Sequence, residues 1–277
     1  MTWTEVRVRG VGDDTRDAIV ALLVGAGASG VIEPTATELL TYVGDGADVD
    51  ALERAVRAAG RDVTVERAPF DDTAWSAPAH ARVGVHRVGR IGVAPPWRAA
   101  ELDDVELPIV IEPAMAFGTG EHETTRGVLH LMQQVVRPGD VVADIGAGSA
   151  VLSIAAARLG ASRVAAIEVD PDAIGNAEEN VARNGVDGRV TVIEGDAALV
   201  LPLVAPVRVI LANILSSVIL ELAPVMRDAL APGGRGIVSG ILVAERAMVV
   251  AALAREGWTL EDEYREGEWW SGVVARP

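Results

Sequence analysis

The sequence of 277 residues contains neither cysteine nor lysine. Without cysteine the chain can form no disulfide, no thiolate nucleophile and no cysteine-bound metal site. Its 24 basic residues are all arginine, and against 40 acidic residues they leave a formal net charge of −16. Nucleic-acid-binding proteins present clustered basic surfaces, so we expect no nucleic-acid partner and favour a basic protein partner. Solubility also explains an acidic surface, and on charge alone it is the simpler interpretation.

Long hydrophobic runs are absent as well. No run approaches the ~18 consecutive apolar residues of a membrane span, and the N-terminal stretch MTWTEVRVRG lacks the apolar segment of a signal peptide. Half of the residues are hydrophobic, which is enough for a sizeable core. We therefore expect a cytoplasmic, monomeric protein without a membrane partner, built from one small and one larger domain.

The first part of the chain alternates short strand and helix patterns. Residues 3–68 follow the order βαββαβ, which is that of a ferredoxin-like sandwich. We predict a small α+β domain over residues 1–68. Periodicity weakens over residues 69–108, where prolines and tryptophans occur, and we predict a linker region with some strand there.

Regular alternation of strands and helices begins at residue 109 and predicts an α/β domain over residues 109–277 with a mostly parallel, Rossmann-like sheet. The last segment has the pattern of a hairpin, which would insert one antiparallel strand. RVTVIEGD and VRVILANIL are expected as successive strands. SSVILELAPVMRDALAPGG is expected as a helix that Pro224 kinks or breaks.

The segment VVADIGAGSAVL, residues 141–152, carries the strongest single signal. Asp144 ends a strand pattern, and Gly146 and Gly148 allow a ligand to approach the backbone closely before a helix begins. Because Val151 occupies the sixth position, the segment fits the dinucleotide fingerprint G-x-G-x-x-G poorly. It fits better the S-adenosylmethionine loop, in which an acid lies two residues before G-x-G-x-G.

Two further acids end the next two strand patterns. A carboxylate at Glu168 can accept hydrogen bonds from both ribose hydroxyls of a nucleotide, and Asp196 is expected near an adenine. Tight turns and solvated strand ends would explain each feature alone. Three acids at successive strand ends, however, favour a nucleoside cofactor, because ligands bind at the carboxyl ends of such strands.

LANIL, residues 211–215, ends the fourth strand pattern. Methyltransferases that act on amino groups of nucleic-acid bases carry Asn/Asp-Pro-Pro-aromatic here, whereas Ile-Leu follows Asn213. The flat clamp for a base is therefore missing, but the Asn213 amide can still accept a hydrogen bond from an amine. Asn213 is also a candidate helix N-cap, and the two roles can coexist.

FGTGEHETT, residues 117–125, precedes another helix pattern. A glycine-rich turn at a helix N-terminus is a typical anion site, but a Walker loop needs a lysine. Thr124 and Thr125 are candidate helix caps. The acids Glu121 and Glu123 flank a histidine, and they suit a cationic ligand better than a phosphate.

Six segments together resemble one known family, the bacterial methyltransferases that modify large-subunit ribosomal protein eleven. The segments are EPAMAFGTGEHETT, DIGAGSAVLSIAAARLGA, VDPDAIGNAEENVARNGV, LANILSSVILELAP, LAPGGRGIVSGIL and GEWWSGVVAR. The resemblance implies a seven-stranded class I methyltransferase sheet and S-adenosyl-L-methionine as methyl donor, with S-adenosyl-L-homocysteine as product. It implies that lysine side chains and the N-terminal amine of the ribosomal protein are methylated, and that the N-terminal domain recognises this substrate.

The resemblance also implies roles for individual residues. Thr125, Gly146, Glu168 and Asn213 are expected to contact the cofactor, and Phe117, Gly118, Thr119 and His122 belong to the loop that closes over it. Asp144, Gly148 and Asp196 complete the predicted cofactor site from the motif argument above, and no metal ligand is predicted. Ala150 stands where the family has a third glycine, and we expect its methyl group to be tolerated.

The chemistry requires a neutral amine aligned with the methyl group. A lysine ammonium has a reference pKa near ~10.4 and must first lose a proton. Asn213 as the acceptor that orients the amine is favoured over His122 as general base. The alternatives are a lysine methyltransferase of the same architecture with another protein substrate, and a cofactor-binding module without catalysis.

Overall fold

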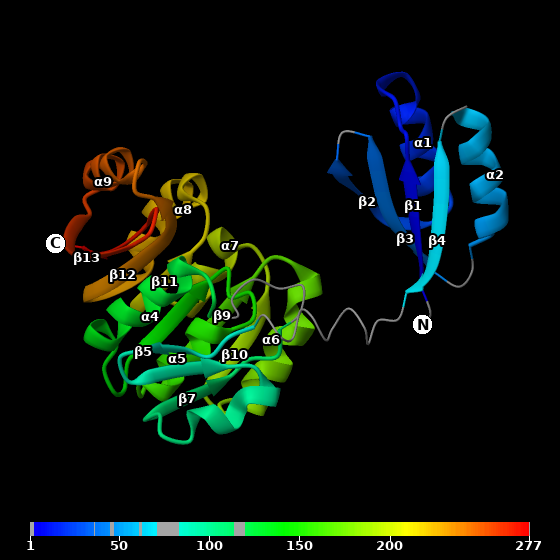
Figure 1. The fold of residues 1–277 in the computed structure, drawn as a ribbon. Coiled ribbons are helices and arrows are strands. Elements are labelled where there is room, and N and C mark those ends of the chain that lie inside the picture. The colour runs from blue at the N-terminus through cyan, green and yellow to red at the C-terminus, as the bar shows by residue number, and fades with distance from the viewer. Residues whose placement is uncertain are drawn as a thin grey trace. The chain divides into compact units, whose positions relative to one another are not determined.

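The structure, a computed structural model, describes residues 3–35, 37–44, 47–60, 63–70, 83–113 and 120–276 (Figure 1). By internal contacts the chain divides into two compact units, Met1–Arg82 and Val83–Pro277. Each unit is described by itself. None of the described helices has the length and apolarity that crossing a membrane requires.

The first unit is a four-stranded antiparallel sheet with two helices. In chain order its elements are β1 Trp3–Arg9, α1 Asp13–Gly25, β2 Ala28–Thr35, β3 Glu38–Gly44, α2 Val49–Ala59 and β4 Thr64–Phe70. The strand order β2-β3-β1-β4 confirms the ferredoxin-like arrangement. Alternate residues of β1, Val6 and Val8, are buried with Ile19 and Leu23 of α1 and Val56 of α2 in one core.

The second unit is built on a seven-stranded sheet with the order β10-β9-β8-β11-β12-β14-β13. Its strands are β8 Val141–Ile145, β9 Arg163–Glu168, β10 Val190–Glu194, β11 Val207–Asn213, β12 Leu230–Leu242, β13 Thr259–Glu266 and β14 Trp269–Ala275. Its helices are α4 Glu123–Val135, α5 Val151–Arg158, α6 Pro171–Arg183, α7 Ala197–Val204, α8 Ser216–Ala229 and α9 Arg246–Arg255. The first five strands are parallel, and β14 pairs antiparallel with β12 and β13. The predicted Rossmann-like sheet with a terminal hairpin is confirmed.

Both faces of the central sheet are buried. On β11, Val209 and Leu211 belong to the core with α4, α5 and α6, whereas Ile210 and Ala212 belong to the core with α7, α8 and α9. Successive side chains of a strand point to opposite faces, so a strand covered on both sides must be apolar throughout. This explains the continuous apolar runs that mark these strands in the sequence.

Residues 83–110 form a small sheet in the second unit. Its elements are β5 His86–Val88, β6 Ile91–Ala94, the 3-10 helix η1 Pro96–Leu102 and β7 Leu107–Val110, with strand order β5-β6-β7. Ile91, Val93 and Ile109 are buried in the same core as α4 and α5. The part of the sequence-derived linker region from residue 83 onward is therefore packed structure, while residues 71–82 lie outside the described ranges.

Two helices differ from the sequence expectation. α7 was not predicted, because its sequence AALVLPLV is apolar throughout and contains Pro202, so it shows no helical periodicity. α8 continues through Pro224 to Ala229, so the helix is not broken there, and a kink at Pro224 remains a prediction. Ile219, Ala223 and Met226, on both sides of Pro224, are buried against the sheet and hold the helix in place.

Two helix glycines make a matched test of this packing. A Cβ at Gly127 of α4 would overlap Ser271 Oγ of β14, which is fixed by a 2.7 Å hydrogen bond to Ser239 Oγ. A Cβ at Gly175 of α6 would meet nothing within 4 Å. We expect Gly127→Ala to lower the free energy of unfolding by about 1–3 kcal/mol and Gly175→Ala to raise it by about 1 kcal/mol. Urea unfolding of both variants checks this, and shifts of the same sign would contradict the close approach of α4 to β14.

Candidate functional site

The parallel strands bring polar side chains together at the carboxyl edge of the sheet. Asp144 lies near the end of β8, Glu168 ends β9 and Asn213 ends β11, and these strands are direct neighbours in the order β9-β8-β11. Asp144 pairs in register with Ala166 on one side and Leu211 on the other. Three of the predicted site residues therefore share one edge, where open α/β sheets bind their ligands.

The glycine loop, residues 146–150, connects β8 to α5 in a conformation that favours glycine. Gly146 and Gly148 have φ angles of 69° and 52°. Gly146 N donates to Ile167 O at 2.9 Å, and Ala147 N donates to the same oxygen at 3.1 Å. Ala150, fully buried, also has a positive φ of 65°. Its methyl group is accommodated, but a left-handed conformation costs an alanine roughly 1–2 kcal/mol.

The side chain of Glu168, the last residue of β9, is hydrogen-bonded to the backbone of this loop. Its Oε2 accepts a hydrogen bond from Gly148 N at 2.8 Å, and its Oε1 accepts from Val169 N and Asp170 N at 2.8 and 3.0 Å. The residue is only 8% exposed. A carboxylate offers about four acceptor sites, so these three bonds leave about one for a ligand. The contact of Glu168 with a ribose remains a prediction.

Asp144, two residues before Gly146, is fully buried. Its Oδ2 accepts a 2.7 Å hydrogen bond from Ser153 Oγ, whereas the buried Oδ1 accepts none from the described residues. Burial disfavours the charged form and raises the pKa of Asp144 to about 6; the nearby Glu168 adds to this rise and Ser153 opposes it. A buried carboxyl with one unused oxygen is an acceptor prepared for a cationic or hydrogen-bonding ligand.

Asn213 shows the same feature at the end of the next strand. Its Nδ2 donates to Oγ1 of Thr125, a buried residue of α4, over 3.4 Å. Its Oδ1 is buried and has no hydrogen-bond partner among the described residues. The structure thus joins Thr125 and Asn213, two predicted site residues 88 positions apart in the sequence. The neighbouring strands β8 and β11 therefore each carry one buried oxygen without a hydrogen-bond partner among the described residues, Asp144 Oδ1 and Asn213 Oδ1.

Ile214 fixes the position of Asn213. A Cβ at Gly146 would lie 2.5 Å from Ile214 Cγ2, and a Cβ at Gly240 of β12 would overlap the backbone oxygen of Ile214. Gly240 has a φ of 81°, so both glycines lie in the left-handed region. The sequence analysis missed Gly240, although a glycine within a strand pattern can mark a close backbone approach.

His122 caps α4, in place of the expected Thr124 or Thr125. Its Nδ1 accepts a hydrogen bond from Thr124 N at 3.3 Å and lies 2.8 Å from Thr124 Oγ1. The ring packs edge-on against Trp269, with centroids 4.9 Å apart. The threonines could not cap because they lie inside the first turn, where their hydroxyls are buried. A role for His122 as general base remains a prediction.

The remaining predicted site residues are placed as follows. Asp196 is exposed and caps α7, accepting from Ala198 N at 2.8 Å, and its contact with an adenine remains a prediction. Phe117, Gly118 and Thr119 lie outside the described residues.

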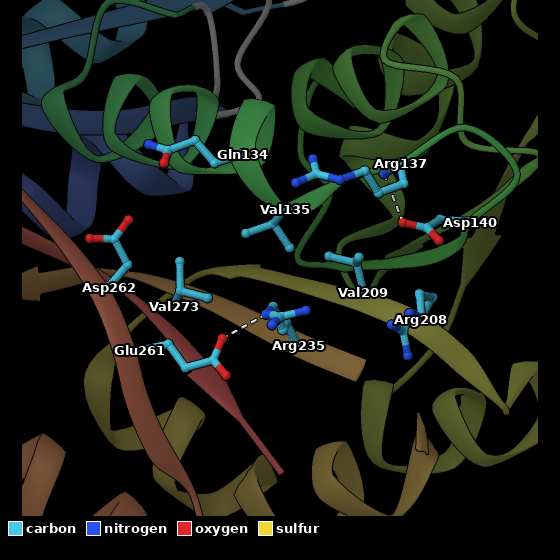
Figure 2. Close-up of a pocket in the computed structure, with 10 residues that line it drawn as sticks. All are labelled: Gln134, Val135, Arg137, Asp140, Arg208, Val209, Arg235, Glu261, Asp262 and Val273. Atoms are coloured by element: carbon cyan, nitrogen blue, oxygen red, sulfur yellow. Dashed lines mark hydrogen bonds and ion pairs between the residues drawn. The ribbon is translucent and has the colours of Figure 1, made fainter. Parts of the chain in front are cut away.

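A separate cavity lies at the opposite, amino edge of the sheet (Figure 2). It has a volume of about 410 Å³ and is lined by Gln134, Val135, Arg137, Asp140, Arg208, Val209, Arg235, Glu261, Asp262 and Val273. Its three arginines are matched by three acids, and Arg235 Nε binds Glu261 at 2.6 Å. The cavity includes none of the predicted site residues, and its balanced charges do not select an anion.

Comparison with known proteins gives one consistent result. A family model described as ribosomal protein L11 methyltransferase (PrmA) matches residues 33–277. The ribosomal protein L11 methyltransferase of Symbiobacterium thermophilum is 40% identical over 207 residues, 71% of this chain and 64% of the relative. That of Thermus thermophilus is 44% identical over 177 residues, 64% of this chain and 67% of the relative.

A solved structure agrees with these sequence matches. The ribosomal protein L11 methylase from Lactobacillus delbrueckii subsp. bulgaricus superposes with a TM-score of 0.62 at 30% identity, covering 69% of this chain and 98% of that one. The match to the relative from Pelotomaculum thermopropionicum, 43% identical, spans 58% of that relative's length. The chain therefore spans about three fifths of the length of the first curated relatives it matches.

The buried Asp144 predicts a specific pH dependence of stability. Its pKa is about 6 in the folded state and near ~3.9 in the unfolded chain, so the folded state binds the proton more tightly. The resulting stabilisation is complete below pH ~4 and is lost as the pH rises through ~6, a total of about 3 kcal/mol. About half of this loss falls between pH ~5 and ~7.5.

Asp144→Asn isolates this effect, because its amide oxygen can still accept from Ser153. We expect the free energy of unfolding of the unsubstituted protein minus that of the variant to fall as the pH rises. Urea unfolding of both proteins between pH ~5 and ~7.5 measures it. A constant difference would contradict a buried acid with a raised pKa.

Proposed function

This chain belongs to the ribosomal protein L11 methyltransferase family, and from this membership we propose that it transfers methyl groups from S-adenosyl-L-methionine to amino groups of ribosomal protein L11. By the family resemblance, the acceptors are lysine side chains and the N-terminal amine. The net charge of −16 suits a basic protein substrate. A ribosomal substrate also suits a cytoplasmic enzyme, and we propose that the enzyme acts as a monomer.

The observation that carries the proposal is the pair of unused, buried acceptors at adjacent strand ends, Asp144 Oδ1 and Asn213 Oδ1. Buried polar atoms in folded proteins almost always have partners. S-adenosyl-L-methionine offers an ammonium group, ribose hydroxyls and an adenine amine as donors, and the glycine loop leaves its backbone open to close approach. The chemistry of these residues therefore fits the cofactor.

Within this fit, Asp144, Gly146, Gly148 and Glu168 would hold the cofactor, and Thr125 would contact it as in the family. The bound cofactor supplies an electrophilic methyl group on its sulfonium. Asn213 Oδ1 would accept a hydrogen bond from the amine of the substrate and so orient the nitrogen lone pair. Thr125 Oγ1 accepts a hydrogen bond from the amide Nδ2, so Oδ1 is the amide atom that has no partner among the described residues.

The N-terminal unit would recognise the protein substrate. Its ferredoxin-like sheet includes none of the predicted cofactor-site residues, and its separate core allows it to serve as a binding module. This assignment follows the family resemblance, as does the division of the chain into recognition and catalytic domains.

The proposal predicts that Asn213→Ala lowers the rate of methyl transfer by about 100-fold, because the amine is no longer aligned. Tritium-labelled S-adenosyl-L-methionine and purified L11 provide the assay, with a total ribosomal protein mixture as alternative substrate. Ser162→Ala, at the amino edge of the sheet, serves as control and should retain the full rate. Thermal unfolding verifies that both variants are folded.

Each outcome has a distinct meaning. A nearly normal rate for folded Asn213→Ala would exclude Asn213 as the orienting residue. Label on another protein band, and none on L11, would overturn the substrate assignment and favour a related lysine methyltransferase. Tight cofactor binding by the unsubstituted protein without any transfer would favour a non-catalytic module.

A further inference from the structure

Three asparagines follow one another, one per turn, along one side of α6: Asn176 and Asn180 lie within the helix, and Asn184 is its C-cap residue. Residues four apart lie above one another on a helix, so the three amides form a row. Asn180 is completely buried and Asn184 nearly so. Asparagine is a modest helix former, and a buried amide must be hydrogen-bonded. The hydrogen-bond partners of the three amides should therefore explain why asparagines occupy these positions.

The three amides form hydrogen bonds with backbone N–H and C=O groups at the free edge of β7 and just after it. β7 pairs only with β6 among the described strands. On its other edge, Asn184 accepts from Val110 N at 2.9 Å and donates to Val110 O at 2.7 Å. Glu112 is bound in the same way by two amides: Asn180 Oδ1 accepts from its N at 2.8 Å, and Asn176 Nδ2 donates to its O at 3.2 Å. The amides thus take the place of a neighbouring strand.

Asn180 alone in this row also reaches the glycine loop. Its Nδ2 donates to Ser149 O at 3.2 Å, between Gly148 and Ala150. A single buried amide therefore connects Glu112 N to the backbone of the loop. The side chain of Asn184, one turn further along, is hydrogen-bonded to Val110 and to the backbone oxygen of Asn180, and to no described residue of the loop.

We propose that Asn180 is a positioning residue for cofactor binding, which acts by fixing the Ser149 carbonyl and with it the shape of the glycine loop. The inference rests on the proposed function, because it assumes that this loop binds the cofactor. Asn180 touches neither Asp144 nor Asn213 through any hydrogen bond, so its effect must pass through the loop backbone. Its expected influence is on cofactor affinity, and the affinity for the protein substrate should not change.

Asn180→Asp and Asn184→Asp form a matched pair. Each keeps the oxygen that accepts from a backbone N–H, of Glu112 or of Val110. Each loses two donated hydrogen bonds: Asn180 those to Ser149 O and Asn176 Oδ1, Asn184 those to Val110 O and Asn180 O. Both introduce the same carboxyl group into the row, at Asn180 within α6 and at Asn184 at its C-cap. Of the two side chains, it is Asn180 that is hydrogen-bonded to the glycine loop.

Calorimetric titration of the full chain with S-adenosyl-L-homocysteine is the test. We expect Asn180→Asp to raise the Kd about tenfold, which corresponds to about 1.4 kcal/mol, the scale of one hydrogen bond. Asn184→Asp should change the Kd less than about twofold, although both variants lose unfolding stability. In the methylation assay, Asn180→Asp should raise KM for the cofactor and leave KM for the protein substrate unchanged.

Equal changes in Kd for the two variants would overturn the inference. So would changes in Kd that are proportional to each variant's loss of unfolding free energy, because Asn180 would then act only through the stability of the fold. If Asn180→Asp does not fold, Asn180→Ser, which keeps a shorter donor, takes its place under the same criteria. Absence of binding by the unsubstituted protein would overturn the proposed function and the inference with it. Normal binding by both the unsubstituted protein and the Asn180 variant would overturn the inference alone.

Discussion

The contact of Ile214 with two glycines is the constraint on which the candidate site depends. Gly146 follows β8 and Gly240 lies in β12, the two neighbours of β11, and neither position leaves room for a Cβ beside Ile214. Asn213, directly before Ile214, therefore has a fixed backbone between three strands. Its side chain is fixed in turn by Thr125, which leaves Oδ1 as the unused acceptor.

Features that oppose stability collect at this same edge. The buried carboxyl of Asp144 with its raised pKa, the unused oxygen of Asn213 and the left-handed backbone of Ala150 each cost free energy in the ligand-free protein. In the interior of β11, by contrast, the side chains from Val209 to Ala212 are apolar and buried. Among the described residues, two of the four buried side-chain atoms without a hydrogen-bond partner lie at this edge, and the other two belong to His86 and Arg158. Local departures from the rules of stable packing are expected where a protein binds its ligand, and those at this edge lie together with the left-handed backbone of the loop.

The sequence predicted the central sheet and the edge of the site well, because strands buried on both faces are long apolar runs and their terminal acids interrupt them. The sequence could not predict contacts that depend on strand register and on the packing of distant segments. That Glu168 binds the backbone of Gly148 follows from a distance between two segments. That His122 caps α4 follows from where the first turn of the helix begins, one or two residues before the threonines that were expected to cap it. α7 has no apolar periodicity. Some strand was expected within residues 69–108, and β5 and β6 confirm it, but strands of three or four residues are too short for the sequence to give their bounds.

The glycine loop is held by its surroundings before any ligand binds. Ile167 O accepts from the first two amides of the loop, Glu168 accepts from Gly148 N, and Asn180 donates to Ser149 O. Glycines are the residues with the most conformational freedom to lose, and here that loss is incurred on folding. A ligand that binds such a loop does not have to order it, so more of the contact energy is available as affinity. The glycines thus provide close approach, while β9 and α6 supply the rigidity that glycines alone would lack.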